Sequence, residues 1–158
     1  MKQWIIFFVS FLSILAVSLM IIILIIGNKP YSEAEKRAID RVMNEEVLAE
    51  VDHAYVFTGS QISVTVIGSD TEGKLMAAFV PDGEGEISSL DLEGITSSAD
   101  AKETALEEMA VKDILHTKLG MESEGPVWEI AFINENDRLN YVYIFAEDGT
   151  WWKRILNL

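Results

Sequence analysis

The chain has 158 residues, a formal net charge of −14 at pH 7 and no cysteine. The missing cysteines exclude disulfide bonds and thiolate metal sites. Because no basic stripe offsets the acidic charge, the composition also argues against nucleic-acid binding.

The chain begins with an apolar segment that predicts a membrane-spanning helix. From Trp4 to Ile26, 23 residues in a row carry no charge. A helix of that length measures about 34 Å, enough to cross a hydrocarbon core of about 30 Å. A cleaved signal peptide is the alternative, but its apolar region would be only about 7 to 15 residues and would precede a small-residue cleavage site. We therefore expect residues 1–28 to form a short cytoplasmic start and a permanent anchor in the lipid bilayer.

The charges around this segment leave its orientation open. Lys2 precedes the span, and four basic residues follow it: Lys29, Lys36, Arg37 and Arg41. That count points the following domain toward the cytoplasm, but long domains cross membranes largely regardless of charge. Residues 29–158 hold 11 basic and 26 acidic residues, a net charge of −15. We expect a single-pass cell-membrane protein with a cytoplasmic N-terminus and an extracellular C-terminal domain.

Residues 29–92 have the pattern of one helix followed by three or four strands. Pro30 should stop the anchor helix from running on smoothly, and Ser32 with Glu35 forms a capping-box pattern. Apolar residues then recur at helical spacing as far as Val51. Alternating segments predict antiparallel strands near residues 53–58, 62–67, 74–80 and 87–92.

Residues 93–158 repeat this pattern. Ser97 with Asp100 forms a second capping pattern, and an apolar helical stripe follows it. Strands are predicted near residues 114–121, 127–133, 139–146 and 150–156. Each half has only about 65 residues, a size at which a single core without disulfides is marginal. We therefore expect an α+β fold in which the two halves pack against each other.

No stretch of the sequence carries a recognisable catalytic motif. The two histidines, His53 and His116, lie outside any nucleophile-elbow or zinc-protease pattern and are interpreted as structural residues. Neighbouring carboxylates on the predicted helices point in different directions, and the acidic turns lack the alternating spacing of a calcium loop. We predict no catalytic residue, metal, cofactor or small-molecule substrate, and a protein that binds rather than one that turns over substrate.

Residues 127–145 predict a hairpin whose two strands both carry aromatic residues. On the first strand Trp128 and Glu129 must point to opposite faces. Because an unpaired carboxylate is costly to bury, the face of Trp128 should be the one under the helix. The candidate core of the C-terminal domain is Trp128, Ile130, Phe132, Val142 and Ile144.

The length of the hairpin loop decides where the second strand points its tyrosines. A three-residue loop at 135–137, or a five-residue loop at 134–138, turns the tyrosines outward, whereas a four-residue loop puts them beneath the helix. We favour the outward arrangement because Asn136 and Asp137 tolerate the left-handed conformation of a three-residue loop. An outward face could pack against the N-terminal half, hold a partner, or be exposed without a role. The candidate partner-binding residues are Tyr141, Tyr143, Phe145, Trp151 and Trp152.

The stretch "VWEIAFINENDRLNYVYIFAEDGTWWKRIL" resembles the C-terminal hairpin of PepSY-type domains. The shared features are an aromatic-Glu-aliphatic start at 128–130, an aromatic–aliphatic second strand and the turn glycine Gly149. Together with the anchor and the segment "VDHAYVFTGSQISVTVIGSDTEGKLMAAFVPD", the whole chain resembles the TseB-like cell-wall elongation regulators of Gram-positive rods. Its ending, with Trp151 and Trp152, is more aromatic than is usual in that family.

The resemblance implies two PepSY/cystatin-like domains, at 29–92 and 93–158, each with one helix packed on an antiparallel sheet of three to four strands. It also implies a non-enzymatic role outside the membrane: binding a penicillin-binding transpeptidase of the elongation machinery and modulating side-wall peptidoglycan synthesis. Because PepSY-like modules also occur in protease propeptides, inhibition of a secreted or membrane-associated peptidase is the alternative. A cryptic hydrolase is the third hypothesis.

Overall fold

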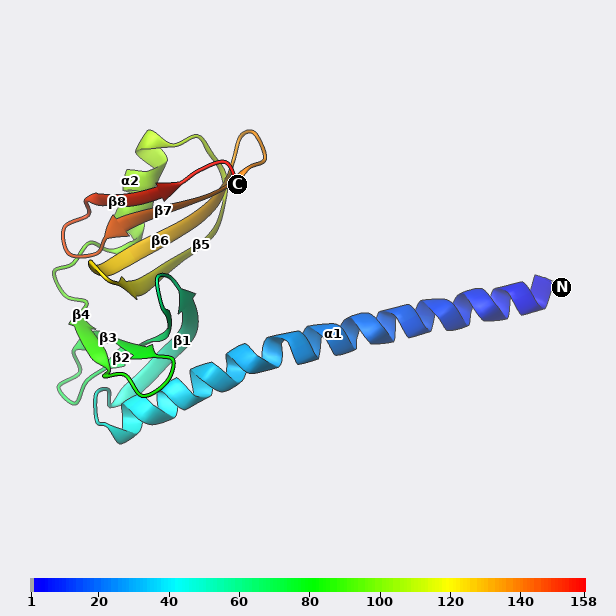
Figure 1. Ribbon diagram of the computed structural model, residues 1–158, viewed down its shortest axis with the longest axis horizontal. Coiled ribbons are helices and arrows are strands. Elements are labelled where there is room, and N and C mark those ends of the chain that lie inside the picture. Colours follow the sequence, from blue (N-terminus) through cyan, green and yellow to red (C-terminus); the bar gives the residue numbers. More distant parts are fainter. Residues whose placement is uncertain (1) are drawn as a thin grey trace.

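The computed structural model describes residues 2–158, with the side chains of 2–6, 9–10 and 24–32 outside the described part. Two helices and eight strands are described within it (Figure 1). In chain order they are α1 Lys2–Asn44, β1 Glu50–Thr58, β2 Ile62–Ser69, β3 Leu75–Pro81, β4 Ser88–Asp91, α2 Ser98–Glu108, β5 Val111–Glu122, β6 Gly125–Asn134, β7 Leu139–Phe145 and β8 Trp151–Ile155.

The strands form two antiparallel sheets of four, and each sheet keeps the order of the chain. We call β1–β4 the N-terminal sheet and β5–β8 the C-terminal sheet. This arrangement confirms the predicted α+β class and places a strand at each of the eight predicted segments. The predicted domain boundary between residues 92 and 93 falls in the connection from β4 to α2 and stays a prediction.

Helix α1 differs from the prediction at both of its expected limits. It continues through Pro30 to Asn44, so the predicted new helix start at Ser32 is wrong. A proline inside a helix removes one hydrogen bond and costs about 3 kcal/mol, which can kink a long helix without ending it. The helix also ends before Val51, which lies in β1, because Glu46 takes a positive φ of 56° just after it.

Among the residues that the structure describes, no helix is long and apolar enough to cross a membrane. The predicted span from Trp4 to Ile26 includes residues 4–6, 9–10 and 24–26, whose side chains lie outside the described part. The anchor therefore stays a prediction.

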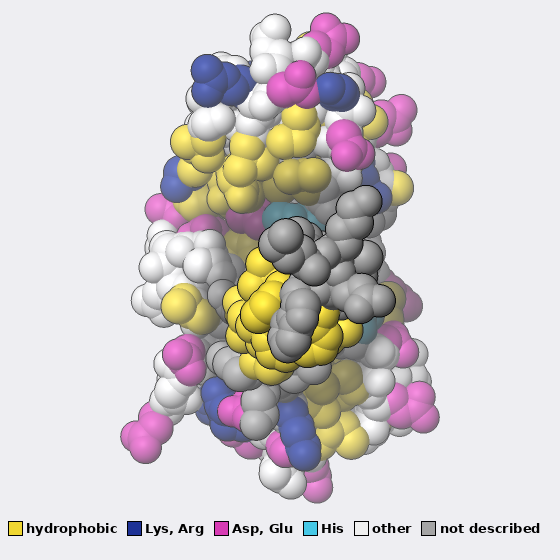
Figure 2. Space-filling view, turned by 90° about the vertical axis from the view of Figure 1, so that its right-hand side faces the viewer, with side chains coloured by type: hydrophobic (Ala, Val, Ile, Leu, Met, Phe, Trp, Pro, Cys, Tyr) yellow, Lys and Arg dark blue, Asp and Glu magenta, His cyan; other side chains and the backbone are white. Residues whose placement is uncertain are grey.

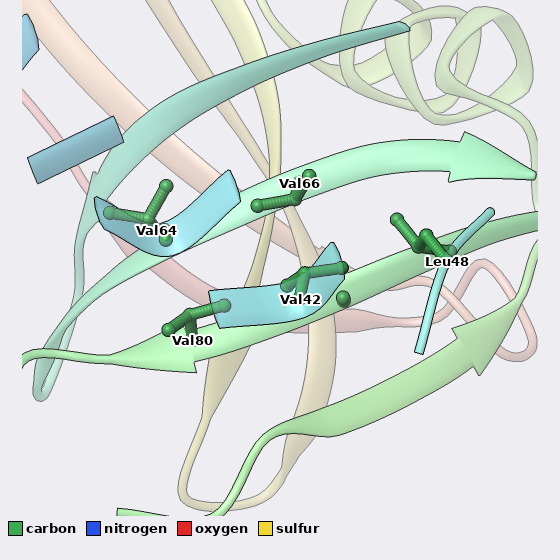
Figure 3. Close-up of a cluster of buried hydrophobic side chains, with 7 residues drawn as sticks. Val42, Leu48, Val64, Val66 and Val80 are labelled. Atoms are coloured by element: carbon green, nitrogen blue, oxygen red, sulfur yellow. The ribbon is translucent and has the colours of Figure 1, made fainter. Parts of the chain in front are cut away.

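The last turns of α1 cover one face of the N-terminal sheet (Figure 3). Side chains alternate between the two faces along a strand, so the even-numbered residues of β2 and β3 point to the face that α1 covers. Burying each of the valine side chains on this face contributes about 1.5–3 kcal/mol. The resulting core consists of Ala38, Val42, Leu48, Val64, Val66, Ala78 and Val80.

Helix α2 covers one face of the C-terminal sheet in the same way. Its start has the predicted capping box: the Ser97 hydroxyl oxygen accepts from the Asp100 backbone N–H at 3.2 Å, and the Asp100 carboxylate accepts from the Ser97 backbone N–H. Ala101 and Ala105 bring the helix close to the sheet. The buried side chains of this core are Ala101, Ala105, Ile130, Phe132, Val142 and Ile144.

The two sheets contact each other through the end of β5, which packs on the N-terminal sheet face opposite α1. Leu119 is fully buried there, in a cluster with Phe79. The backbone oxygen of Leu119 accepts from the Thr65 hydroxyl at 2.9 Å and from the Tyr55 hydroxyl at 3.1 Å. The expectation that the two halves pack together is therefore confirmed.

Candidate functional site

The β6–β7 hairpin has the register that a three-residue loop produces. Ile130 pairs with Val142, and the backbone N–H of Asn134 donates to the backbone oxygen of Arg138 at 2.9 Å. The loop is therefore 135–137, and its last residue, Asp137, has the left-handed φ of 58° that such a loop needs. The preferred loop length is confirmed.

This register places the candidate core residues under α2. Ile130, Phe132, Val142 and Ile144 are buried in the α2 cluster, and Trp128 is partly buried at its edge. The Trp128 indole N–H donates to the backbone oxygen of Thr96 at 2.8 Å, which satisfies its polar atom at the start of α2.

The sheet face opposite α2, which we call the outer face, holds four of the five candidate partner-binding residues. Tyr143 is only 7% exposed and packs with Phe57 of β1. Tyr141, Phe145 and Trp152 lie around it and are partly buried. Packing against the N-terminal half therefore occupies part of this face, and Tyr143 is not available as an exposed contact.

Trp151 lies on the other side of the sheet from Trp152. It packs against the α2 core, and the guanidinium carbon of Arg154 lies 3.8 Å from the centre of its ring. The five candidates therefore do not form one surface, which corrects their grouping from the sequence.

A bulge in β8 arranges the outer face in a way that strand alternation does not predict. Lys153 pairs with Tyr143, but the next pair is Ile144 with Trp151, so Trp152 is an extra residue. Trp152 contacts the Tyr143 ring edge-on, with ring centres 5.7 Å apart. The Lys153 ammonium lies 5.6 Å from the Trp152 ring centre and 5.7 Å from that of Tyr143, within cation–π range. The bulge thus puts Trp152 and Lys153 side by side on one face.

Beneath the aromatic side chains lies a buried polar group that the sequence reasoning missed. Glu129, expected on the face away from the helix, is only 7% exposed. Its carboxylate contacts His116 Nε2 at 2.9 Å and accepts from the Tyr143 hydroxyl at 2.8 Å. Burial, followed by the nearby Glu129 carboxylate, raises the pKa of Tyr143, so the hydroxyl stays protonated and donates. Both oxygens of Glu129 are therefore engaged, which fits a structural role rather than that of a general base.

A cleft of about 380 Å³ opens beside this network, between the outer face and β1. We call it the interunit cleft; His116, Lys118, Tyr141 and Val56 are among the residues that line it. The Lys118 ammonium donates to the backbone oxygen of Val56 at 3.1 Å and so joins the two sheets. Figure 2 shows hydrophobic side chains gathered over the C-terminal sheet, on the side of the molecule from which α1 extends. Within the described part of the chain, no three His, Cys, Asp or Glu side chains come together as a metal site.

Two contacts fix β1 and the turn that follows it against β5. The Glu122 carboxylate accepts from the backbone N–H of Ser60 at 2.9 Å. The Phe57 ring lies directly over Gly120, where an added Cβ would stand 2.3 Å from ring carbons. The glycine is therefore required for the close approach of the two sheets.

Comparison with known proteins relates the N-terminal part of the chain to a family. Residues 37–81, from the end of α1 to the end of β3, match the cell wall elongation regulator TseB-like domain. The resemblance predicted from the sequence is confirmed for this segment. The likeness of the hairpin at 127–145 to PepSY-type domains lies outside the match and stays a prediction.

A solved structure has the same fold over most of the chain. The YpmB protein from Bacillus subtilis is 24% identical, with a TM-score of 0.70 and coverage of 78% of this chain and 97% of that chain. Among curated proteins, none matches this chain.

Proposed function

We propose that this chain, whose residues 37–81 match the TseB-like domain, is a non-enzymatic regulator of cell wall synthesis that acts by binding a penicillin-binding transpeptidase. The observation that carries the proposal is the match to the cell wall elongation regulator domain. Two buried acidic groups support a non-enzymatic role, because both are engaged in structural hydrogen bonds: Glu129 joins neighbouring strands, and Glu122 joins β5 to the β1–β2 turn.

We place the regulator in the cell membrane, with residues 4–26 as its single span, the N-terminus in the cytoplasm and the domain outside. Large apolar side chains of α1 support this placement: Phe8 is 62% exposed and Ile23 is 68% exposed. Figure 1 shows this part of α1 extending away from the two sheets. Exposing apolar side chains is unfavourable in water and favourable in hydrocarbon, so this segment fits a bilayer environment.

The proposed docking surface is the accessible part of the outer face. Tyr141, Phe145 and Trp152 each keep part of their side chain exposed, and Lys153 adds a cation beside them. Large, rigid aromatic side chains over a packed support are typical of binding hot spots. Tyr143 supplies that support from beneath through its contacts with Phe57 and Glu129.

The proposal is tested by co-purification from detergent-solubilised membranes of cells that express the full chain. We expect a penicillin-binding transpeptidase to co-purify with the wild type, and the double replacement Tyr141→Ala/Trp152→Ala to remove it. Leu115→Ala, at an exposed leucine of β5, is the matched control and should leave co-purification unchanged. Unchanged thermal unfolding would show that the variants are folded.

Two outcomes would count against the proposal. Full co-purification by the folded double variant would refute the docking surface. The absence of any wall-synthesis enzyme from the wild-type sample would refute the partner.

A further inference from the structure

A second cavity, of about 530 Å³, lies between α1 and the N-terminal sheet. We call it the α1 groove: Ala34, Arg37, Ala38 and Arg41 of α1 face Ile62 and Val80 of the sheet. Residues four apart lie on the same side of a helix, so the two alanines form one row and the two arginines the next. The small alanines leave space against the sheet, and the arginines stand along the rim.

The two arginines differ in what they contact. The Arg41 guanidinium donates to the backbone oxygen of Gly85 at 2.6 Å and to Glu45 at 2.7 Å, which ties α1 to the β3–β4 connection. Arg37 is exposed and, among the described residues, makes no hydrogen bond or ion pair. Asp82 also lines the groove. Because Glu45 already pairs with Arg41, Arg37 is the lining cation that has no carboxylate partner among the described residues.

We infer that the α1 groove binds an extended segment of a partner protein in which a carboxylate side chain is flanked by apolar ones. Apolar walls such as Ile62 and Val80 accept apolar side chains, and a guanidinium binds a carboxylate through paired hydrogen bonds. Residues 29–158 carry a net charge of −15. An arginine that has no partner among the described residues, beside an apolar groove, is therefore complementary to an acidic ligand where most of the surface is not. This inference rests on the proposed membrane-anchored function.

The position of the groove along α1 favours a protein segment over a lipid. At about 1.5 Å per residue, residues 34–41 lie about 12 to 22 Å beyond Ile26, the end of the proposed span. The polar headgroup layer on each side of a bilayer is only about 5 to 7 Å thick. A lipid headgroup in the bilayer does not reach that far, whereas the segment just outside a partner's own anchor lies at that height. Figure 2 shows basic and hydrophobic side chains next to each other on the N-terminal unit below α1.

The inference is tested by photo-crosslinking the full chain in the membranes of its host cells. Benzoylphenylalanine replaces Ile62, which is 54% exposed at the groove. In the control it replaces Leu75, which is 44% exposed at the start of β3 and does not line the groove. Mass spectrometry of the crosslinked peptides should identify, at position 62 alone, a membrane-proximal segment with a carboxylate between apolar residues. Adducts to lipid, or equal yields of the same peptides at both positions, would overturn the inference.

A pair of charge variants tests the role of Arg37. Arg37→Gln should lower the crosslinking yield at position 62 about tenfold or more, because a hydrogen bond to a charged group contributes about 1.5–3 kcal/mol. Lys36→Gln removes the same charge from the neighbouring exposed residue of α1, outside the groove, and should change the yield less than about twofold. Replacing the acidic residue of the crosslinked partner segment by arginine should restore the crosslinking yield at position 62 when it is combined with Arg37→Glu in this chain. An unchanged yield in Arg37→Gln would overturn the proposed charge pairing.

A third crosslinking position separates this inference from the proposed function. Benzoylphenylalanine at Tyr141 probes the outer face in the same membranes. Capture of a transpeptidase at 141 with no segment captured at 62 refutes the groove inference alone. Capture at 62 of an acidic and apolar segment from a protein unrelated to wall synthesis, with no wall enzyme at 141, supports the groove inference and refutes the proposed function.

Discussion

Phe57→Ala should destabilise both sheets together rather than β1 alone. The Phe57 ring is fully buried between the sheets, packs with Val127 and Tyr143 of the outer face and lies over Gly120. Replacing a buried phenylalanine by alanine costs about 3–5 kcal/mol. For residues 29–158, which number 130, the unfolding entropy is about 0.27 kcal/mol/K, so the melting temperature should fall by about 11–18 °C.

The assay is thermal unfolding of the full chain in detergent, with near-UV circular dichroism as the signal that is recorded. Ile62→Ala, at an exposed position of the same sheet, is the control and should shift the melting temperature by less than about 2 °C. A decrease in melting temperature of less than about 3 °C in Phe57→Ala would refute the prediction that Phe57 holds the two sheets together. So would two separate transitions in the wild type, because the sheets would then unfold independently.

Three further predictions concern stability. Burial raises the pKa of Tyr55 to about 12, although its hydrogen bond with Leu119 acts in the opposite direction. An unfolded tyrosine ionises near pH 10. Up to about 3 kcal/mol of the free energy of unfolding that is present below pH 10 should therefore be lost as the pH rises to 12. In Tyr55→Phe, the free energy of unfolding measured by urea titration should fall less steeply between pH 9 and pH 12. A fall as steep as in the wild type would show that Tyr55 does not cause it. Gly120→Ala should cost about 1–3 kcal/mol by overpacking, and adding Phe57→Leu should cost less than the sum of the two single changes; strict additivity would show that the ring and the glycine are not coupled. Ser97→Ala should cost about 1 kcal/mol by removing the helix cap, measured by chemical denaturation, and no change would mean that the cap contributes nothing to stability.

Features set by neighbouring residues were predictable from the sequence. The capping box at Ser97 and Asp100 and the three-residue loop ending at Asp137 depend on short-range hydrogen bonds and backbone conformation. Because the loop fixes the register, the placement of Ile130 and Val142 followed from it.

Features set by contacts between distant segments were not predictable. Glu129 is buried because His116 and the Tyr143 hydroxyl satisfy it, and the sequence does not show that these side chains meet. Trp152 lies beside Lys153 because of a bulge, for which the consecutive polar and aromatic residues of β8 were a weak signal. The continuation of α1 through Pro30 depends on how a long helix tolerates one local defect, which residue preferences alone do not determine.

The proposed function requires that this chain regulate cell wall synthesis through its outer face. It is tested most directly by measuring fluorescent D-amino acid incorporation along the side wall of cells that lack the chain. Those cells should show altered side-wall labelling, the full wild-type chain should restore it, and Tyr141→Ala/Trp152→Ala should not. Side-wall labelling that is the same with and without the chain would refute the proposed role in cell wall synthesis.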